Sequence, residues 1–170
     1  DWPSIAVTRS GTFFGGSDFT EGNGIKRLDA GNGVLVDTNI KDGTWTSIFE
    51  YFGTTFFVNS DNELYMWNGS DVITTGINDF DAWEIKTIDP LNLMLLCSKN
   101  DDGFKYFTGS TFVSGSTTGS GWKYQVIPSG YVLYPTITSG TPYIITNSKS
   151  FKGLANTDIY THFAHVILTE

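Results

Sequence analysis

A tryptophan recurs at near-constant intervals along the chain. Trp2, Trp45, Trp83 and Trp122 are separated by 43, 38 and 39 positions, and β-prone runs and polar turns follow each of them. A repeat of about 40 residues is typical of β-propeller blades, in which each repeat forms one small sheet. The spacing therefore predicts four Trp-led repeats followed by a last strand, at residues 2–44, 45–82, 83–121, 122–158 and 159–170.

The runs between the turns alternate with a period of two, and no stretch keeps a helical periodicity. The 19 glycines in 170 residues suit a chain that turns sharply many times, because glycine tolerates positive φ angles. We therefore predict one all-β domain over residues 1–170, a propeller-like array of about four short antiparallel blades. A β-sandwich or jelly roll is the alternative, since short strands at regular spacing also fit those folds.

The clearest repeat begins at Trp45. Its frame is Trp45-x-x-Ile48, Gly53, Phe56-Phe57-Val58, Asp61 and Leu64-Tyr65-x-Trp67-x-Gly69. This frame resembles the longer repeat of the family named for the regulator of chromosome condensation. The resemblance implies propeller blades, as found in phage and virion surface proteins, and no nucleotide-exchange activity is carried over. The other repeats match at Trp2, Gly11, Gly15 and Gly16, at Trp83, Ser98, Gly103, Tyr106 and Gly109, and at Trp122, Gly130, Gly140 and Tyr143.

Two turns, at residues 60–63 and 98–103, resemble the Asp-box hairpin of sialidase-type propellers, in which a carboxylate satisfies turn amides. We interpret both turns as structural. A four-bladed hemopexin-like ring would match the repeat count, but its stapling disulfide is impossible because Cys97 is the sole cysteine. Cys97 ends an apolar run, which predicts a small buried hydrophobic side chain.

The charge balance excludes several classes of function. Ten Lys and Arg residues against 18 Asp and Glu residues give a net charge of −8, so no surface that follows a nucleic-acid backbone is expected. No apolar run approaches the ~20 residues that span a bilayer, so no membrane insertion is predicted. The chain begins at Asp1 without a signal peptide, which indicates a processed product or a piece of a longer polypeptide.

Neither a catalytic centre nor a metal site is expected. His162 and His165 lie three positions apart in one β-prone run, so their side chains would point to opposite faces of a strand and could not share a metal ion. Asx-rich turns at 78–81 and 100–102 offer oxygens to calcium, but such turns are commoner than calcium sites. No spacing singles out a glycosidase pair among the carboxylates Glu50, Asp79, Asp81 and Glu84. We therefore predict a protein that is not an enzyme and needs no cofactor.

The leading tryptophans are expected in the core, because repeats need apolar wedges and burial of an indole is strongly favourable. Trp67 has no counterpart in the other repeats. It is therefore the aromatic residue that we assign first to ligand contact, together with Tyr65 and Asn68. Replacement of Trp45 by alanine is expected to impair folding, and replacement of Trp67 to spare it.

We interpret the chain as a non-enzymatic structural or recognition module on an exposed surface. A glycine- and hydroxyl-rich, lysine-poor composition is common in extracellular and virion proteins, which favours a bacteriophage virion component such as a tail, fibre or decoration protein. The expected partners are other virion or surface proteins and host-surface glycans, and a homo-oligomer is left open. Two alternatives remain, a carbohydrate-binding lectin and a fragment of a glycosidase-type propeller.

Overall fold

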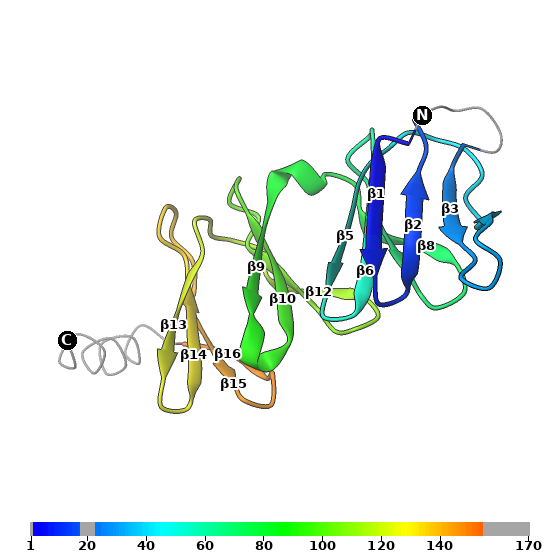
Figure 1. Cartoon of the computed structure of the whole chain (residues 1–170). Helices are drawn as coiled ribbons and strands as arrows, with labels where there is room; N and C mark the ends of the chain where they lie inside the picture. The colour runs from blue at the N-terminus through cyan, green and yellow to red at the C-terminus, as the bar shows by residue number, and fades with distance from the viewer. Residues whose placement is uncertain (1, 18–22, 155–170) are drawn as a thin grey trace. The chain divides into compact units, whose positions relative to one another are not determined.

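The computed structural model describes residues 2–17 and 23–154. Within these residues the chain is all-β, and its sixteen strands form four antiparallel sheets of four strands each (Figure 1). This architecture confirms the predicted all-β, propeller-like fold. The strands of every sheet follow one another in chain order, whereas jelly rolls and most sandwiches contain Greek-key crossovers.

Each sheet begins at, or shortly after, one of the leading tryptophans. The first sheet contains β1 (Ser4–Thr8), β2 (Gly11–Gly15), β3 (Ile25–Leu28) and β4 (Leu35–Asp37). The second contains β5 (Trp45–Tyr51), β6 (Thr54–Asn59), β7 (Leu64–Trp67) and β8 (Val72–Ile77). The third contains β9 (Trp83–Ile88), β10 (Leu93–Ser98), β11 (Phe104–Phe107) and β12 (Phe112–Ser116). The fourth contains β13 (Lys123–Ile127), β14 (Gly130–Tyr134), β15 (Tyr143–Thr146) and β16 (Phe151–Gly153).

The chain divides into two compact units. The first unit, Asp1–Asp81 with Gly109–Thr111, holds the first and second sheets. The second unit, Ala82–Thr108 with Phe112–Glu170, holds the third and fourth sheets. The assignment of residues 1–170 to a single domain stays a prediction. The strand predicted at 159–170, with His162 and His165, lies outside the described residues.

Tight turns join the first two strands of the sheets. Strands β5 and β6 meet at Phe52-Gly53, where φ is 49° and 85°. Two successive left-handed residues are what a two-residue type I′ hairpin requires. Between β9 and β10 the chain forms a short 3-10 helix (Asp89–Leu91) and then turns at Asn92, where φ is 47°. Asparagine tolerates this conformation well, and Phe52 is an unusual residue to adopt it.

Side chains at the ends of β6 and β10 hold the turns that follow. Asn59 Oδ1 accepts the backbone N–H groups two and four residues on, at 3.1 and 2.9 Å. Ser98 Oγ accepts the equivalent N–H groups at 3.0 and 3.1 Å. Both turns thus have the structural role that the sequence indicates, but the acceptor is not an Asp-box carboxylate. A polar side chain at the end of a strand lies next to the amides of the following turn, so it can accept their hydrogen bonds.

The core of the first unit is shared by its two sheets. Phe13 of β2 meets Phe57 of β6 edge to face, with ring centroids 5.2 Å apart. Trp45 is only 3% exposed, and its indole N–H donates to the carbonyl oxygen of Asp42 at 3.2 Å. This hydrogen bond removes the cost of burying an unpaired N–H group.

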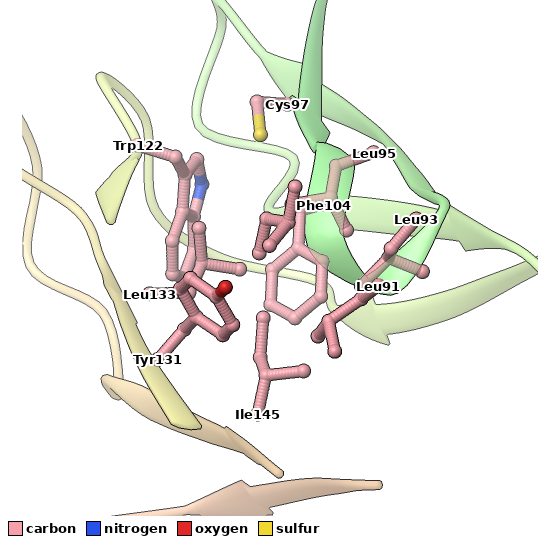
Figure 2. Packing of buried hydrophobic residues seen from close by; sticks show 10 residues of the cluster. Leu91, Leu93, Leu95, Cys97, Phe104, Trp122, Tyr131, Leu133 and Ile145 are labelled. Carbon is pink, nitrogen blue, oxygen red and sulfur yellow. The ribbon is translucent and has the colours of Figure 1, made fainter. Parts of the chain in front are cut away.

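Figure 2 shows the core of the second unit. Phe104 lies at its centre, with its ring centroid 4.9 Å from that of Trp122 and 5.2 Å from that of Tyr143. Trp122 is 1% exposed and donates its indole N–H to the carbonyl oxygen of Gly119 at 2.9 Å. The buried members of this cluster are Ile88, Leu91, Leu93, Leu95, Cys97, Phe104, Trp122, Tyr131, Leu133 and Ile145.

Three of the four leading tryptophans are buried, as the sequence predicts. Trp45, Trp83 and Trp122 are buried, and Trp2 is half-buried. Trp45 and Trp122 also form the same hydrogen bond: each donates its indole N–H to the carbonyl oxygen of the residue three positions earlier in the chain. In the second and fourth repeats the recurrence thus corresponds to a common way of burying an amphipathic ring.

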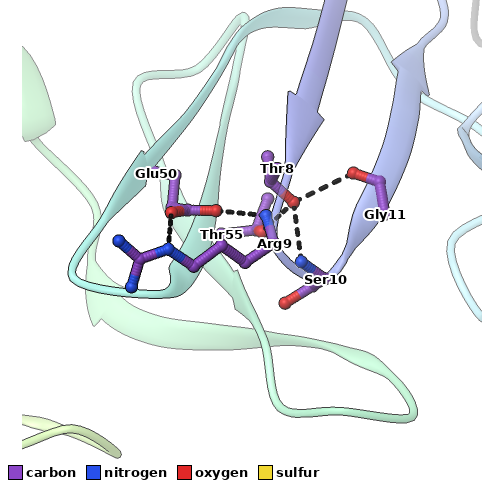
Figure 3. Close-up of polar contacts among 6 residues, drawn as sticks. All are labelled: Thr8, Arg9, Ser10, Gly11, Glu50 and Thr55. Atoms are coloured by element: carbon purple, nitrogen blue, oxygen red, sulfur yellow. Dashed lines mark hydrogen bonds and ion pairs between the residues drawn. The ribbon is translucent and has the colours of Figure 1, made fainter.

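Polar side chains join the two sheets of the first unit beside the β1–β2 turn (Figure 3). The buried Thr55 donates its hydroxyl to Thr8 Oγ1 at 2.7 Å, and Thr8 forms further hydrogen bonds within its own turn. Glu50 of β5 accepts the backbone N–H of Arg9 and pairs with its guanidinium Nε at 3.3 Å. These contacts fix the turn against β5.

In the second unit one carboxylate connects three loops. Asp101, in the β10–β11 turn, accepts the backbone N–H of Gly119 and the hydroxyl of Thr138, the latter at 2.6 Å. Thr138 also lies 3.1 Å from the buried Ser120 hydroxyl. The hydrogen bond from Thr138, and then that from Gly119, lowers the pKa of the Asp101 carboxyl below its ordinary value, against a smaller opposing effect of desolvation.

We expect this contact to make unfolding pH-dependent. Because the pKa of Asp101 is lower in the folded state than in the unfolded chain, its stabilising contribution is complete above the unfolded pKa of about 4 and is lost as the pH falls through the folded value. Urea unfolding of the Asp101→Asn variant between neutral and acidic pH should therefore show a shallower fall in stability than the wild type. Asp61→Asn removes a turn carboxylate that joins no loops and should keep the wild-type slope; identical slopes for all three proteins would contradict the assignment.

Candidate functional site

Strand β7 carries two of the three residues that the sequence assigns to ligand contact. Tyr65 and Trp67 are two positions apart, so they point to the same face of the second sheet, while Leu64 and Met66 are buried on the other face. Both aromatic rings are half-buried. Asn68 follows the strand and is exposed.

Trp67 packs against the core of the first unit. Its ring centroid lies 5.3 Å from that of Phe13, and the guanidinium carbon of Arg27 lies 5.6 Å from the same ring. Arg27 is itself anchored, because its Nη2 donates to the carbonyl oxygen of Ser10 at 2.6 Å. Trp67 therefore borders the core of the first unit and packs against Arg27 of the first sheet. The sequence did not predict this structural role.

Asn68 holds a turn. Its Oδ1 accepts the backbone N–H groups of Ser70 and Asp71 at 2.9 and 2.8 Å, and the Ser70 hydroxyl at 3.2 Å. These contacts form an Asx turn between β7 and β8. With its carbonyl oxygen engaged three times, Asn68 has only its amide N–H₂ group left for a ligand.

Tyr65, the third predicted residue, borders a pocket of about 200 Å³ that we call the Tyr65 pocket. Its ring lies edge-on to that of Trp45, with centroids 5.2 Å apart, and its hydroxyl donates to Glu63 Oε2 at 3.0 Å. Desolvation, and then the hydrogen bond to Glu63, raises the pKa of the Tyr65 hydroxyl. The pocket is lined by Ile40, Asp42, Gly43, Thr44, Trp45, Asn59, Ser60, Asp61 and Tyr65.

Oxygen acceptors dominate the Tyr65 pocket. The exposed carboxylates of Asp42 and Asp61 belong to its lining, as do the hydroxyls of Thr44 and Ser60. The side chain of Asn59 already forms internal hydrogen bonds. Its amide N–H donates to Glu63 at 2.7 Å, and its carbonyl oxygen accepts two backbone N–H groups of the following turn. An aromatic residue beside several acceptors suits a ligand that presents hydroxyl donors, as a sugar does.

A second hollow, of about 610 Å³, lies in the second unit. It is lined by Lys86 and Thr87 of β9, by Lys123, Tyr124 and Gln125 of β13, and by Tyr134. We call it the β9–β13 groove. Sequence reasoning missed it, because its lining comes from two sheets; the only local signal is Lys123-Tyr124-Gln125, a polar and aromatic run next to a leading tryptophan.

Two of the four carboxylates considered for catalysis, Glu50 and Glu84, form ion pairs. Glu50 is bound to Arg9 in the first unit (Figure 3), and Glu84 pairs with Lys86 at 3.1 Å in the second. Asp102 accepts the Ser98 hydroxyl at 3.3 Å, beside the connecting carboxylate of Asp101. Across residues 2–17 and 23–154, no group of three or more His, Cys, Asp or Glu side chains could hold a metal ion. The same residues include no helix long and apolar enough to cross a membrane.

Cys97 is buried in the core of the second unit, as its apolar neighbourhood predicts. It is 1% exposed, and desolvation raises the pKa of its thiol to about 12. A thiol with so high a pKa is almost fully protonated at neutral pH. Cys97 is therefore no nucleophile in the folded protein.

No protein-family model matches the chain, and a search of the curated proteins finds no relative. The resemblance to the repeats of the regulator of chromosome condensation stays a prediction.

The two tryptophans of the second sheet should differ in their effect on stability. Trp45→Ala removes a fully buried ring and should lower the free energy of unfolding by about 3–5 kcal/mol. Trp67→Ala removes a half-buried ring and should lower it by about 1–3 kcal/mol, because contacts with Phe13 and Arg27 are lost. Urea unfolding followed by circular dichroism measures both; equal losses would contradict this ranking.

Cys97 should resist thiol reagents until the protein unfolds. We expect no reaction of the native protein with a disulfide reagent at mildly alkaline pH, and complete reaction of its single thiol in denaturant. The Cys97→Ala variant supplies the blank. Rapid labelling of the native protein at a rate independent of denaturant would show that the thiol is accessible and would contradict its place in the core.

Proposed function

We propose that this chain is a non-enzymatic recognition module on an exposed surface, in a bacteriophage virion component such as a tail, fibre or decoration protein. The observation that supports recognition is the Tyr65 pocket, in which an aromatic residue and several oxygen acceptors are carried by strands and short loops of the first unit. The assignment to a virion is supported by the composition, which is rich in glycine, serine and threonine and poor in lysine.

A non-catalytic role is supported by the use of the acidic side chains. Glu50 and Asp101 hold loops, and Glu63 accepts hydrogen bonds from Asn59 and Tyr65. A general acid or base needs a positioned group that is free to exchange a proton with the substrate. Carboxylates that already accept several internal hydrogen bonds are better suited to structure than to turnover.

Contacts with other virion or surface proteins are supported by β1. Ile5 is 57% exposed and Val7 83% exposed. Both point to the face of the first sheet that carries Phe14, because Ile5 pairs with Phe14 across the ladder. Large apolar side chains that cluster on a surface are typical of protein interaction sites.

Carbohydrate binding by the Tyr65 pocket is the form of recognition that we propose first. A sugar presents hydroxyl donors, and the lining of the pocket combines the carboxylates of Asp42 and Asp61 with the aromatic residue Tyr65. Host-surface glycans are therefore the proposed ligands. Cleavage of the bound glycan, as in a glycosidase-type propeller, is the competing outcome in the test that follows.

A glycan array probed with the labelled full chain tests the proposal. We expect binding to a subset of glycans, with affinity reduced roughly tenfold in an Asp42→Asn, Asp61→Asn double variant, because two acceptors at the pocket lose their charge. Asp71→Asn changes an exposed carboxylate of the same unit outside the pocket and should bind like the wild type.

Two results would overturn the proposal. A blank array at high protein concentration would overturn carbohydrate binding by the Tyr65 pocket. Mass spectrometry of the bound glycans after prolonged incubation should show no shortened products. Catalytic amounts of cleaved glycan would assign the chain to the glycosidase class.

A further inference from the structure

The β9–β13 groove runs along two strand edges. Strand β9 is the edge strand of the third sheet and β13 that of the fourth (Figure 1). Neighbouring residues of a strand point to opposite faces, yet Lys123, Tyr124 and Gln125 all line the groove. The groove therefore wraps the edge of β13, where backbone groups are not used by a neighbouring strand of the same sheet.

Charge distinguishes this groove from the rest of the chain. The protein carries ten basic residues and a net charge of −8, but the lining of the groove contains two lysines and no carboxylate. Lys123 is exposed. The lining of the groove thus offers two ammonium groups, of which that of Lys86 is paired with the neighbouring Glu84.

Lys86 is held in place but can still reach an anion. Its side chain is 23% exposed and pairs at 3.1 Å with Glu84, whose side chain is 54% exposed. An ion pair so open to water contributes little stability. An incoming anion can therefore share the ammonium group, which offers three hydrogen-bond donors.

Aromatic rings complete the lining. Tyr124 is 38% exposed, and its ring is held edge to face by Tyr131, with centroids 6.0 Å apart. Tyr134 of β14, which pairs with Lys123 of β13, also lines the groove. A fixed, partly exposed tyrosine ring beside an ammonium group suits a ligand that combines an apolar ring face with a negative charge.

We propose that the β9–β13 groove binds an acidic saccharide, a sugar ring that carries a carboxylate. The carboxylate lies between Lys86 and Lys123, and the sugar ring lies against Tyr124. The volume of about 610 Å³ is in the range of small-ligand sites and accommodates one or two sugar rings. This site goes beyond the Tyr65 pocket, which is rich in acceptors and disfavours an anion.

A pair of matched ligands tests the proposal on the full chain. Galacturonic acid and its methyl ester share one ring and differ in charge, so isothermal titration calorimetry isolates the contribution of the carboxylate. We expect the acid to bind at least about tenfold more tightly than the ester, and this preference to shrink as salt is raised.

Lysine variants locate the site. Lys123→Gln should remove most of the preference for the acid, and Lys86→Gln should do the same if its fold is intact by circular dichroism. Lys152→Gln changes an exposed lysine of the fourth sheet outside the groove and should bind like the wild type. Because Lys123 is exposed, its variant decides the question even if the Lys86 variant unfolds.

Four results would overturn the proposal. Equal affinity for acid and ester would exclude charge recognition, and absence of binding at millimolar ligand would exclude the site. Sulfate that binds as tightly as galacturonic acid would reduce the groove to an unspecific anion site. An oligoglutamate peptide that displaces the sugar and binds more tightly would assign the groove to acidic peptides. None of these results bears on the Tyr65 pocket, which is tested by its own variants.

Discussion

Burial of an amphipathic aromatic ring between two sheets is the interaction on which each unit depends. A four-stranded sheet cannot bury its apolar face alone, so each unit pairs two sheets around a tryptophan and a phenylalanine. The indole N–H would make such burial costly if it were left unpaired. Trp45 and Trp122 solve this with a carbonyl oxygen from the loop that leads into their own sheet, so the ring and the loop are fixed together.

Polar groups then decide which loops are rigid. Among the described residues every buried side-chain nitrogen or oxygen has a hydrogen-bond partner. Thr55 and Glu50 attach the β1–β2 turn to the second sheet, and Asp101 attaches three loops to one another. In the Tyr65 pocket, Asn59 has the same role, because its side chain accepts two backbone N–H groups of the turn that carries Asp61. An ordered turn favours recognition, because little conformational entropy is lost when a ligand binds.

The sequence predicts the fold better than the sites. The regular spacing of the tryptophans and the runs with a period of two predict four sheets correctly, because all four strands of a sheet come from one repeat. The packing of Trp67 could not be predicted from its own repeat, because its partners Phe13 and Arg27 belong to another sheet; its assignment to ligand contact stays a prediction. The β9–β13 groove could not be predicted for the same reason, because Lys86 and Tyr124 come from two different sheets and line one groove only in the folded protein. In the two turns, the acidic residues predict that a carboxylate accepts the hydrogen bonds of the turn amides. The side chains of Asn59 and Ser98 accept them instead.

The meander order of the strands has a kinetic consequence. Every ladder joins strands that are adjacent in the chain, so each sheet closes only short loops as it forms, and short loops close quickly and at low entropic cost. Hairpins of this kind form within microseconds. The slow step of folding is then the meeting of two preformed sheets around a tryptophan. The strands of each sheet therefore pair without distant sequence, but a sheet becomes stable only when its partner sheet packs against it.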